Sequence, residues 1–113
     1  MAFSSQFVEI EPARKDIDAI RGPAVLHFCT DWCGYCQDAE PLIRRVLAAH
    51  PQVHHIRVED GRGRPLGRSF GIKLWPTLVF LSDGCEVARV IRPESIQIIE
   101  QAMKKIVARD NGE

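Results

Sequence analysis

The segment AVLHF, residues 24–28, is almost entirely apolar. Such a run is typical of a strand covered on both faces, as in a parallel sheet. Between residues 33 and 50 the spacing becomes helical, with apolar positions on one side and Arg44 and Arg45 on the other. The pattern therefore predicts a buried strand that leads into an amphipathic helix. Pro41 lies within this predicted helix and should kink it.

The same reasoning predicts the remaining elements. They are, in chain order, a short strand at 7–10, a short helix at 13–21, a strand at 53–59, a loop with one helical turn after residue 59, two strands around Asp83-Gly84, and a closing helix with Pro93 and Glu94 in its first turn. Asp-Gly between two β-rich runs is a strong hairpin signal. This order predicts one α/β domain over residues 1–113, a central mixed sheet with helices on both faces.

The composition is that of an ordinary globular protein. Lys and Arg number 15, Asp and Glu number 15, and 45% of the 113 residues are hydrophobic. This balance gives no electrostatic basis for binding nucleic acid or an anionic membrane, and we expect neither as a partner. Arg62, Arg64 and Arg68 form a local basic cluster. We interpret it as a solvated loop rather than a site for phosphate or an acidic partner.

The start of the chain bears on the compartment. Residues 1–16 contain no basic segment that leads into a continuous apolar one, so we expect no signal peptide. No apolar stretch approaches the ~20 residues of a membrane-spanning helix. These features predict a cytoplasmic protein, or a periplasmic one if a leader has been removed. In the cytoplasm a Cys-x-x-Cys motif is more often catalytic or metal-binding than structural.

The segment CTDWCGYC, residues 29–36, carries the chemistry most clearly. Its last two cysteines, Cys33 and Cys36, fall between the buried strand and the first turn of the helix. Unpaired N–H groups and the helix dipole at that end favour an anion at the first cysteine. Because a thiolate is the nucleophile of disulfide exchange, Cys33 is predicted to attack and Cys36 to resolve the mixed disulfide.

Several separated motifs resemble the thioredoxin family over residues ~7 to ~108. DWCGYC is similar to that family's (E/D)WCGPC, Pro41 to its helix-kinking proline, and GIKLWPT to the stretch with its cis-proline, here Pro76. The resemblance implies a thioredoxin fold and a monomeric thiol–disulfide oxidoreductase acting on protein disulfides. It implies no cofactor and no metal, and electrons from a thioredoxin-reductase-like partner. It also implies that Trp32 shields the disulfide, that Gly34 and Tyr35 tune its potential, and that Pro76 presents a backbone edge to the substrate.

The departures from this pattern also carry predictions. Tyr35 replaces a proline, and Cys-Gly-Tyr-Cys is similar to the more oxidising pair of periplasmic disulfide isomerases, so the direction of the reaction stays open. His27 stands where the family has a buried aspartate, and His55 is the counterpart of its lysine. Two imidazoles could relay the proton of the resolving cysteine. Alternatively, His27 is a core residue and His55 a surface one.

The predicted substrate groove differs as well. Leu74 and Trp75 precede Pro76 where the family has Gly and Ile, and Arg92 replaces a glycine. Bulk and a cation at the rim should narrow the set of substrates, and Arg92 could favour a thiolate at Cys33. The alternative is that Trp75 serves packing and Arg92 is solvated.

Other interpretations of the cysteines remain. Cys29 is expected to be a buried small hydrophobe that points away from the pair, and Cys85 a free, exposed thiol. The spacing Cys29-x3-Cys33-x2-Cys36 also resembles the cluster loop of radical S-adenosylmethionine enzymes. A zinc site is a further interpretation, but zinc needs four ligands and the sequence has no second Cys-x-x-Cys or His-x3–5-His pair to complete them. Another possibility is a thioredoxin-fold binding module that docks a partner protein through Trp32 and Trp75, with redox chemistry incidental.

Overall fold

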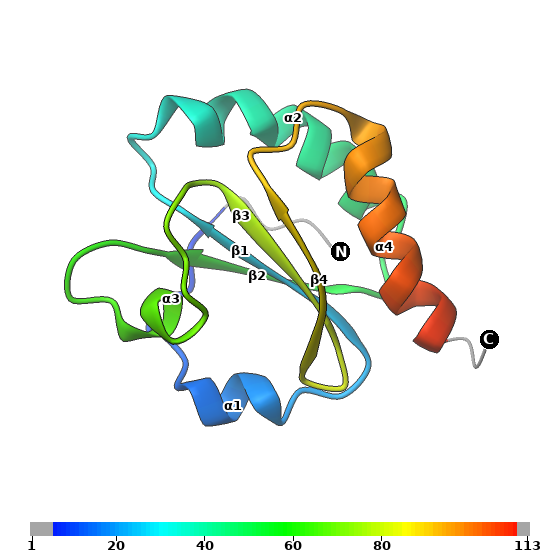
Figure 1. Ribbon diagram of the computed structural model, residues 1–113, viewed down its shortest axis with the longest axis horizontal. Helices are drawn as coiled ribbons and strands as arrows, with labels where there is room; N and C mark the ends of the chain where they lie inside the picture. The colour runs from blue at the N-terminus through cyan, green and yellow to red at the C-terminus, as the bar shows by residue number, and fades with distance from the viewer. Residues whose placement is uncertain (1–5, 111–113) are drawn as a thin grey trace.

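A four-stranded mixed sheet forms the centre of the computed structural model, which describes residues 6–110, with side chains up to residue 107. The strands lie in the order β2 (His54–Glu59), β1 (Pro23–Cys29), β3 (Thr77–Ser82) and β4 (Cys85–Ile91) (Figure 1). β1 is parallel to β2 and antiparallel to β3, and β4 is antiparallel to β3. The predicted mixed sheet is confirmed.

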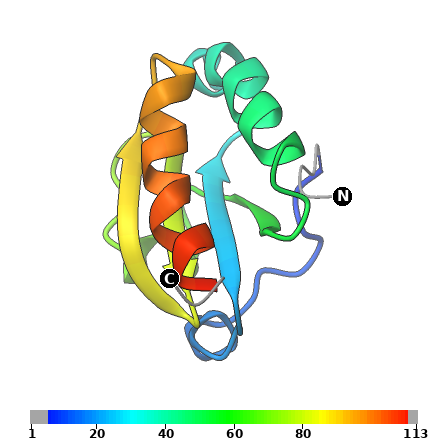
Figure 2. The ribbon, with the colours of Figure 1, turned by 90° about the vertical axis from the view of Figure 1, so that its right-hand side faces the viewer.

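Helices cover both faces of this sheet. They are α1 (Arg14–Asp18), α2 (Gly34–Ala48), α3 (Pro65–Ser69) and α4 (Ile96–Asp110). Apart from Cys36, the buried residues of α2 and α4 share one core cluster with Val25 and Phe80 of the sheet. Those of α1 and α3 share a second cluster with Leu26 and Phe28. Figure 2 shows α4 lying across the front of the sheet, with α2 at its upper end.

The central strand β1 explains the apolar run in the sequence. All of its seven residues are buried. Because side chains alternate between the faces of a strand, Leu26 and Phe28 enter one core cluster and Val25 the other. His27 and Cys29 therefore lie on the same face as Val25, beneath α2 and α4. This alternation places two chemically active side chains under the start of α2.

Two of the predicted elements are wrong. Residues 7–10 form no strand: the N–H of Val8 donates to the carbonyl of Arg57 at 2.9 Å, but the segment bends away and Ile10 is 85% exposed. The closing helix begins at Ile96, so Pro93 and Glu94 precede its first turn. The Ser95 hydroxyl accepts a hydrogen bond from the N–H of Ile98 at 3.3 Å. This capping interaction starts the helix after the proline.

The predicted hairpin is present between β3 and β4. Asp83 and Gly84 both have positive φ angles, 50° and 80°. Asp83 Oδ1 accepts a hydrogen bond from the N–H of Gly22 at 2.8 Å, and a Cβ on Gly84 would clash with the backbone carbonyl of Asp18. Glycine is therefore required here by both conformation and space, and the turn is fixed against the end of α1.

The sequence-based expectations about the start of the chain fall partly on residues 1–5, which lie outside the described residues. Within residues 6–110, every helix is too short or too polar to cross a bilayer.

Candidate active site

Cys33 occupies the N-cap position of α2, with φ −84° and ψ 120°. Its carbonyl accepts the hydrogen bond of the Gln37 N–H at 3.1 Å. Cys36 follows in the first turn, and the two side chains are 6% and 3% exposed. Both are free thiols in this structure. The first N–H groups of a 15-residue helix lack intrahelical partners, so they can stabilise a thiolate at Cys33.

Cys29 belongs to the same site, and the expectation that it points elsewhere is wrong. Its fully buried side chain forms one contact cluster with Cys33 and Cys36, against which Phe7 and Trp75 pack. The reason is the alternation of β1, whose last residue faces the underside of α2. The site therefore contains three sulfur atoms rather than two.

The thiols of Cys29 and Cys36 are hydrogen-bonded to each other, and this bond shifts them in opposite directions. It is the largest cause that lowers the pKa of Cys29, with the charge of Arg57 also lowering it while burial opposes the shift. The same bond, followed by burial, raises the pKa of Cys36 far above its ordinary value. Within this pair Cys29 therefore loses its proton first.

An ion pair formed by a buried arginine and a partly exposed glutamate lies next to the cysteines. Arg57 Nη1 donates to Glu40 Oε1 at 2.6 Å, and the arginine side chain is 8% exposed. Arg57 comes from β2 and Glu40 from α2, so the pair connects the sheet to the helix that carries Cys36. Neither residue stands out in the sequence, because a charge within a strand or helix pattern gives no sign of whether it faces the core or solvent.

The two histidines singled out from the sequence are in contact. His27 Nδ1 lies 3.0 Å from His55 Nε2, and the rings stack with centroids 5.2 Å apart. Burial first, then the nearby His55 and Arg57, hold the pKa of His27 well below its ordinary value. Burial and Arg57 lower the pKa of His55 to about 4. Both rings are thus neutral near pH 7. His27 Nε2 is buried without a hydrogen-bond partner among the described residues.

The predicted cis-proline is confirmed: the Trp75–Pro76 peptide bond is cis, and Pro76 is buried. Trp75 is half-buried rather than exposed. Its Nε1 donates to Asp60 Oδ2 at 2.9 Å, and its ring meets that of Trp32 edge-on at 5.6 Å. Trp32 is 70% exposed. The two indole rings therefore contact each other beside the cysteines. Trp75 is held by Asp60, whereas Trp32 is exposed.

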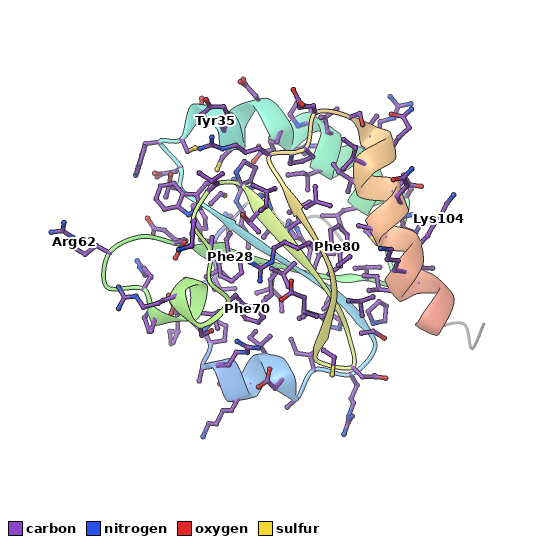
Figure 3. The ribbon with its side chains drawn as sticks, viewed as in Figure 1. Phe28, Tyr35, Arg62, Phe70, Phe80 and Lys104 are labelled. Carbon is purple, nitrogen blue, oxygen red and sulfur yellow. The ribbon has the colours of Figure 1, made fainter. Side chains whose placement is uncertain are left out.

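Arg92 is half-buried and bridges the two loops of the site. Its Nε donates to the carbonyl of Trp75 at 2.9 Å, and its guanidinium carbon lies 3.7 Å from the centre of the Tyr35 ring. Its own N–H donates to the carbonyl of Pro76 at 2.9 Å. Figure 3 shows Tyr35 on the first turn of α2. These contacts link Tyr35, Arg92 and Trp75, the residues that were predicted to border the substrate groove.

The basic cluster noted in the sequence lies beside this groove. Arg62, Arg64 and Arg68 line a hollow together with Lys73 and Trp75. Arg64 pairs with Glu59 at 3.0 Å, and Arg62 projects away from the body of the protein (Figure 3). Cys85 is exposed at the start of β4. Among residues 6–110, no group of three or more His, Cys, Asp or Glu side chains is placed to hold a metal ion.

A family model described as Thioredoxin matches residues 8–105. The chain belongs to the thioredoxin family. Thioredoxin 2 from Pseudomonas aeruginosa PAO1, solved in its reduced form, is 50% identical, with a TM-score of 0.83 over 95% of this chain and 99% of that one. The thioredoxin of Chlamydia muridarum is 32% identical over 71 residues, which are 62% of this chain and 69% of that protein.

Longer thioredoxin relatives are similar over part of their length only. The TPR repeat-containing thioredoxin TDX of Arabidopsis thaliana is 29% identical over 83 residues, which are 74% of this chain but 22% of that protein. Together with the structural match, the family model confirms the predicted thioredoxin fold and the predicted class, a thioredoxin-like thiol–disulfide oxidoreductase.

Proposed function

We propose that this protein exchanges a Cys33–Cys36 dithiol/disulfide pair with the disulfides of protein substrates, as a single thioredoxin-like domain over residues 1–113. The observation that carries the proposal is the position of Cys33 at the N-cap of a long helix, with Cys36 in its first turn. A thiolate at that position is favoured by the helix end, and thiolates are the attacking species in disulfide exchange.

The proposed reduction has two steps. The Cys33 thiolate attacks one sulfur of the substrate disulfide, forms a mixed disulfide and releases the first substrate thiolate. Cys36, after losing its proton, then attacks Cys33, closes the internal disulfide and releases the second substrate thiolate. No bound cofactor or metal takes part. Electrons return through a thioredoxin-reductase-like partner, and the reverse sequence oxidises a substrate dithiol.

Substrate selection is assigned to the groove around Pro76. Its backbone, with Gly34 and Tyr35 opposite, would bind an extended substrate segment, and Trp32 would shield the disulfide. Trp75 and Arg92 add bulk and a positive charge to the rim, which favours a restricted set of protein disulfides. Arg92 is held at this place by its contacts with Tyr35 and the Trp75 carbonyl.

The His27–His55 pair is proposed as a proton relay beneath Cys36. Its support is the 3.0 Å contact and the unpartnered, buried Nε2 of His27. Because both rings are neutral near pH 7, the pair would move a proton by changing tautomers rather than by storing charge. A His27→Ala variant with an unchanged exchange rate from about pH 6 to about pH 9 would end this assignment.

Insulin reduction with dithiothreitol tests the main proposal. Wild type should accelerate precipitation of the insulin B chain, Cys33→Ser should abolish the effect, and Cys36→Ser should accumulate a mixed disulfide. The second candidate is a binding module that docks a partner through the two tryptophans, favoured by the 70% exposure of Trp32. Equal activity of wild type and Cys33→Ser would favour the module.

We propose a monomer that acts in the cytoplasm, with neither nucleic acid nor a membrane as partner. The neutral overall charge supports the absence of nucleic acid and of a membrane as partners. A periplasmic location would apply if a leader is removed from the natural protein. Cell fractionation with an antibody against the protein distinguishes the two compartments.

A further inference from the structure

The proposed function uses two of the three buried cysteines and leaves Cys29 without a role. Cys29 is the last residue of β1, fully buried, and in the cluster with Cys33 and Cys36. Its thiol is hydrogen-bonded to that of Cys36, the group that must lose a proton before it can resolve a mixed disulfide. A thiol in this place is in direct contact with a reacting atom.

The charges around Cys29 come from both elements packed against it. On β2, Arg57 brings a positive charge that lowers the pKa of Cys29, and Glu59 is the register partner of Cys29. On α2, Glu40 opposes ionisation of Cys29 but is held by Arg57 at 2.6 Å. The carboxylate of Asp60, in the following loop, accepts from Trp75. Arg57 is thus a counter-ion already in place for a Cys29 thiolate.

We propose that Cys29 is the immediate proton acceptor of Cys36 in the resolving step, an inference that rests on the proposed Cys33–Cys36 exchange. The form that enters the resolving step carries one proton on the two buried thiols, with the proton on Cys36 and the negative charge on Cys29 next to Arg57. When a substrate occupies Cys33, the proton moves along the existing hydrogen bond and Cys36 becomes the nucleophile.

The step balances without any further reactant. The Cys36 S–H bond breaks and a Cys29 S–H bond forms, which leaves a thiolate on Cys36. This thiolate attacks the Cys33 sulfur, forms the Cys33–Cys36 bond and breaks the bond between Cys33 and the substrate sulfur. The substrate departs as a thiolate with the electron pair of the broken bond. One negative charge is present before and after, and the proton remains on Cys29.

His27 is less suited to be this first acceptor. It shares a strand face with Cys29, but its Nδ1 is engaged with His55 and burial makes it a weak base. Among the hydrogen bonds of Cys36, the one to Cys29 has the largest effect on its pKa, ahead of those to the Thr30 backbone and to Cys33. His27 and its partner would therefore take part only after the proton has reached Cys29.

Stopped-flow reaction with 5,5′-dithiobis(2-nitrobenzoate) separates the two steps. All proteins carry Cys85→Ala, because that exposed thiol would also react. The first nitrothiobenzoate is released by attack of Cys33 in a phase that depends on reagent concentration. The second is released when Cys36 resolves the adduct, in a phase that does not. Absence of the first phase would refute the proposed function, whereas a change confined to the second phase reports on the role of Cys29.

We expect Cys29→Ala to slow the second phase about 10- to 100-fold near pH 7 and to leave the first phase little changed. The midpoint of the second phase should also move to higher pH. In wild type, Cys29 and Cys36 titrate as a coupled pair, and the first proton of that pair is lost readily. In the variant Cys36 titrates alone, and burial makes its ionisation costly. Cys29→Ser should behave like Cys29→Ala, because a hydroxyl keeps the shape but does not ionise in this range.

Val25→Ala is the matched control, since it removes buried atoms from the same face of β1 away from the cysteines. It should lower the melting temperature and leave the pH profile of the second phase unchanged. The inference is overturned if Cys29→Ala keeps the wild-type profile, or if Cys29→Ser restores the wild-type rate. It is also overturned if Cys36→Ala still releases the second nitrothiobenzoate, because Cys29 would then be a nucleophile itself.

Discussion

The guanidinium carbon of Arg92 lies 3.7 Å from the centre of the Tyr35 ring, so the loop after β4 holds the dipeptide between the two cysteines. A cation over an aromatic face is attracted by about 0.5–2 kcal/mol, depending on how far it is desolvated. The same side chain donates to the carbonyl of Trp75, the residue before the cis-proline. Arg92 thus connects the loop after β4 with the first turn of α2 and with the segment before the cis-proline. Its charge lies at the N-terminal end of α2.

The first prediction concerns the redox potential. Replacing Tyr35 by the proline usual in the family removes the ring that holds Arg92. The reduced, thiolate form then loses part of its electrostatic stabilisation, so the potential should become more negative by about 30 mV, or about 1.4 kcal/mol. Proline is tolerated in the first turn of a helix. Equilibration of the Cys33–Cys36 pair with glutathione measures the change.

Tyr35→Phe is the matched control for this prediction, because it keeps the ring under Arg92 and removes only the hydroxyl. Its potential should stay close to that of wild type. A proline variant with an unchanged or less negative potential would show that Tyr35 does not tune the pair through Arg92.

The second prediction concerns the backbone of Arg92, which has a φ of +48°. Left-handed conformations cost an L-residue about 1–2 kcal/mol and cost glycine little. Arg92→Ala and Arg92→Gly both lose the side-chain contacts, but only alanine keeps the strain. The glycine variant should therefore be more stable than the alanine variant by about 1 kcal/mol in urea unfolding. Equal stabilities would show that this backbone is not strained.

The sheet and the helix after β1 could be predicted because each depends on a local pattern, whereas the cis-proline was predicted from the resemblance of GIKLWPT to the thioredoxin family. The apolar run, the helical spacing and the Asp-Gly turn are read from neighbouring residues. The strand at 7–10 was wrong, because a short apolar pattern does not say whether a partner strand lies beside it. The helix start at Ile96 was missed because Ser95 and Pro93 are both acceptable near a helix start.

The surroundings of the cysteines were harder to predict than the cysteines themselves. The Cys-x-x-Cys spacing carries its own chemistry. The position of Cys29 depends on which face of β1 meets α2, and the role of Arg57 depends on its tertiary partner Glu40. Such contacts join segments far apart in sequence, and the residue types alone do not determine them.

The third prediction sets electrostatics against exposure. Cys85 is exposed, whereas Cys33 is only 6% exposed. If thiols reacted in order of exposure, iodoacetamide would modify Cys85 first. Because the N-terminal end of α2 favours a thiolate, we expect Cys33 to be alkylated faster in the reduced protein near neutral pH. Peptide mass spectrometry over a time course measures both rates, and faster labelling of Cys85 would contradict the proposed role of Cys33.

The last prediction concerns stability in mild acid. The pKa of His27 lies well below 6.5 in the folded protein and that of His55 is about 4, so the unfolded chain binds more protons between about 4 and 6.5. Stability must then rise with pH through this range. The contribution of the two histidines is complete above 6.5 and is lost progressively as the pH falls towards 4.

Urea unfolding of wild type and a His27→Leu, His55→Gln double variant between about pH 5 and 6.5 avoids most carboxylate titration. As the pH falls from about 6.5 to about 5, wild type should lose stability, and the double variant should lose much less. His54→Gln is the matched control, because His54 precedes His55 on β2 but is exposed. It should keep the wild-type slope. A double variant with the full wild-type slope would place the pH dependence elsewhere and would remove the evidence that burial keeps this histidine pair neutral.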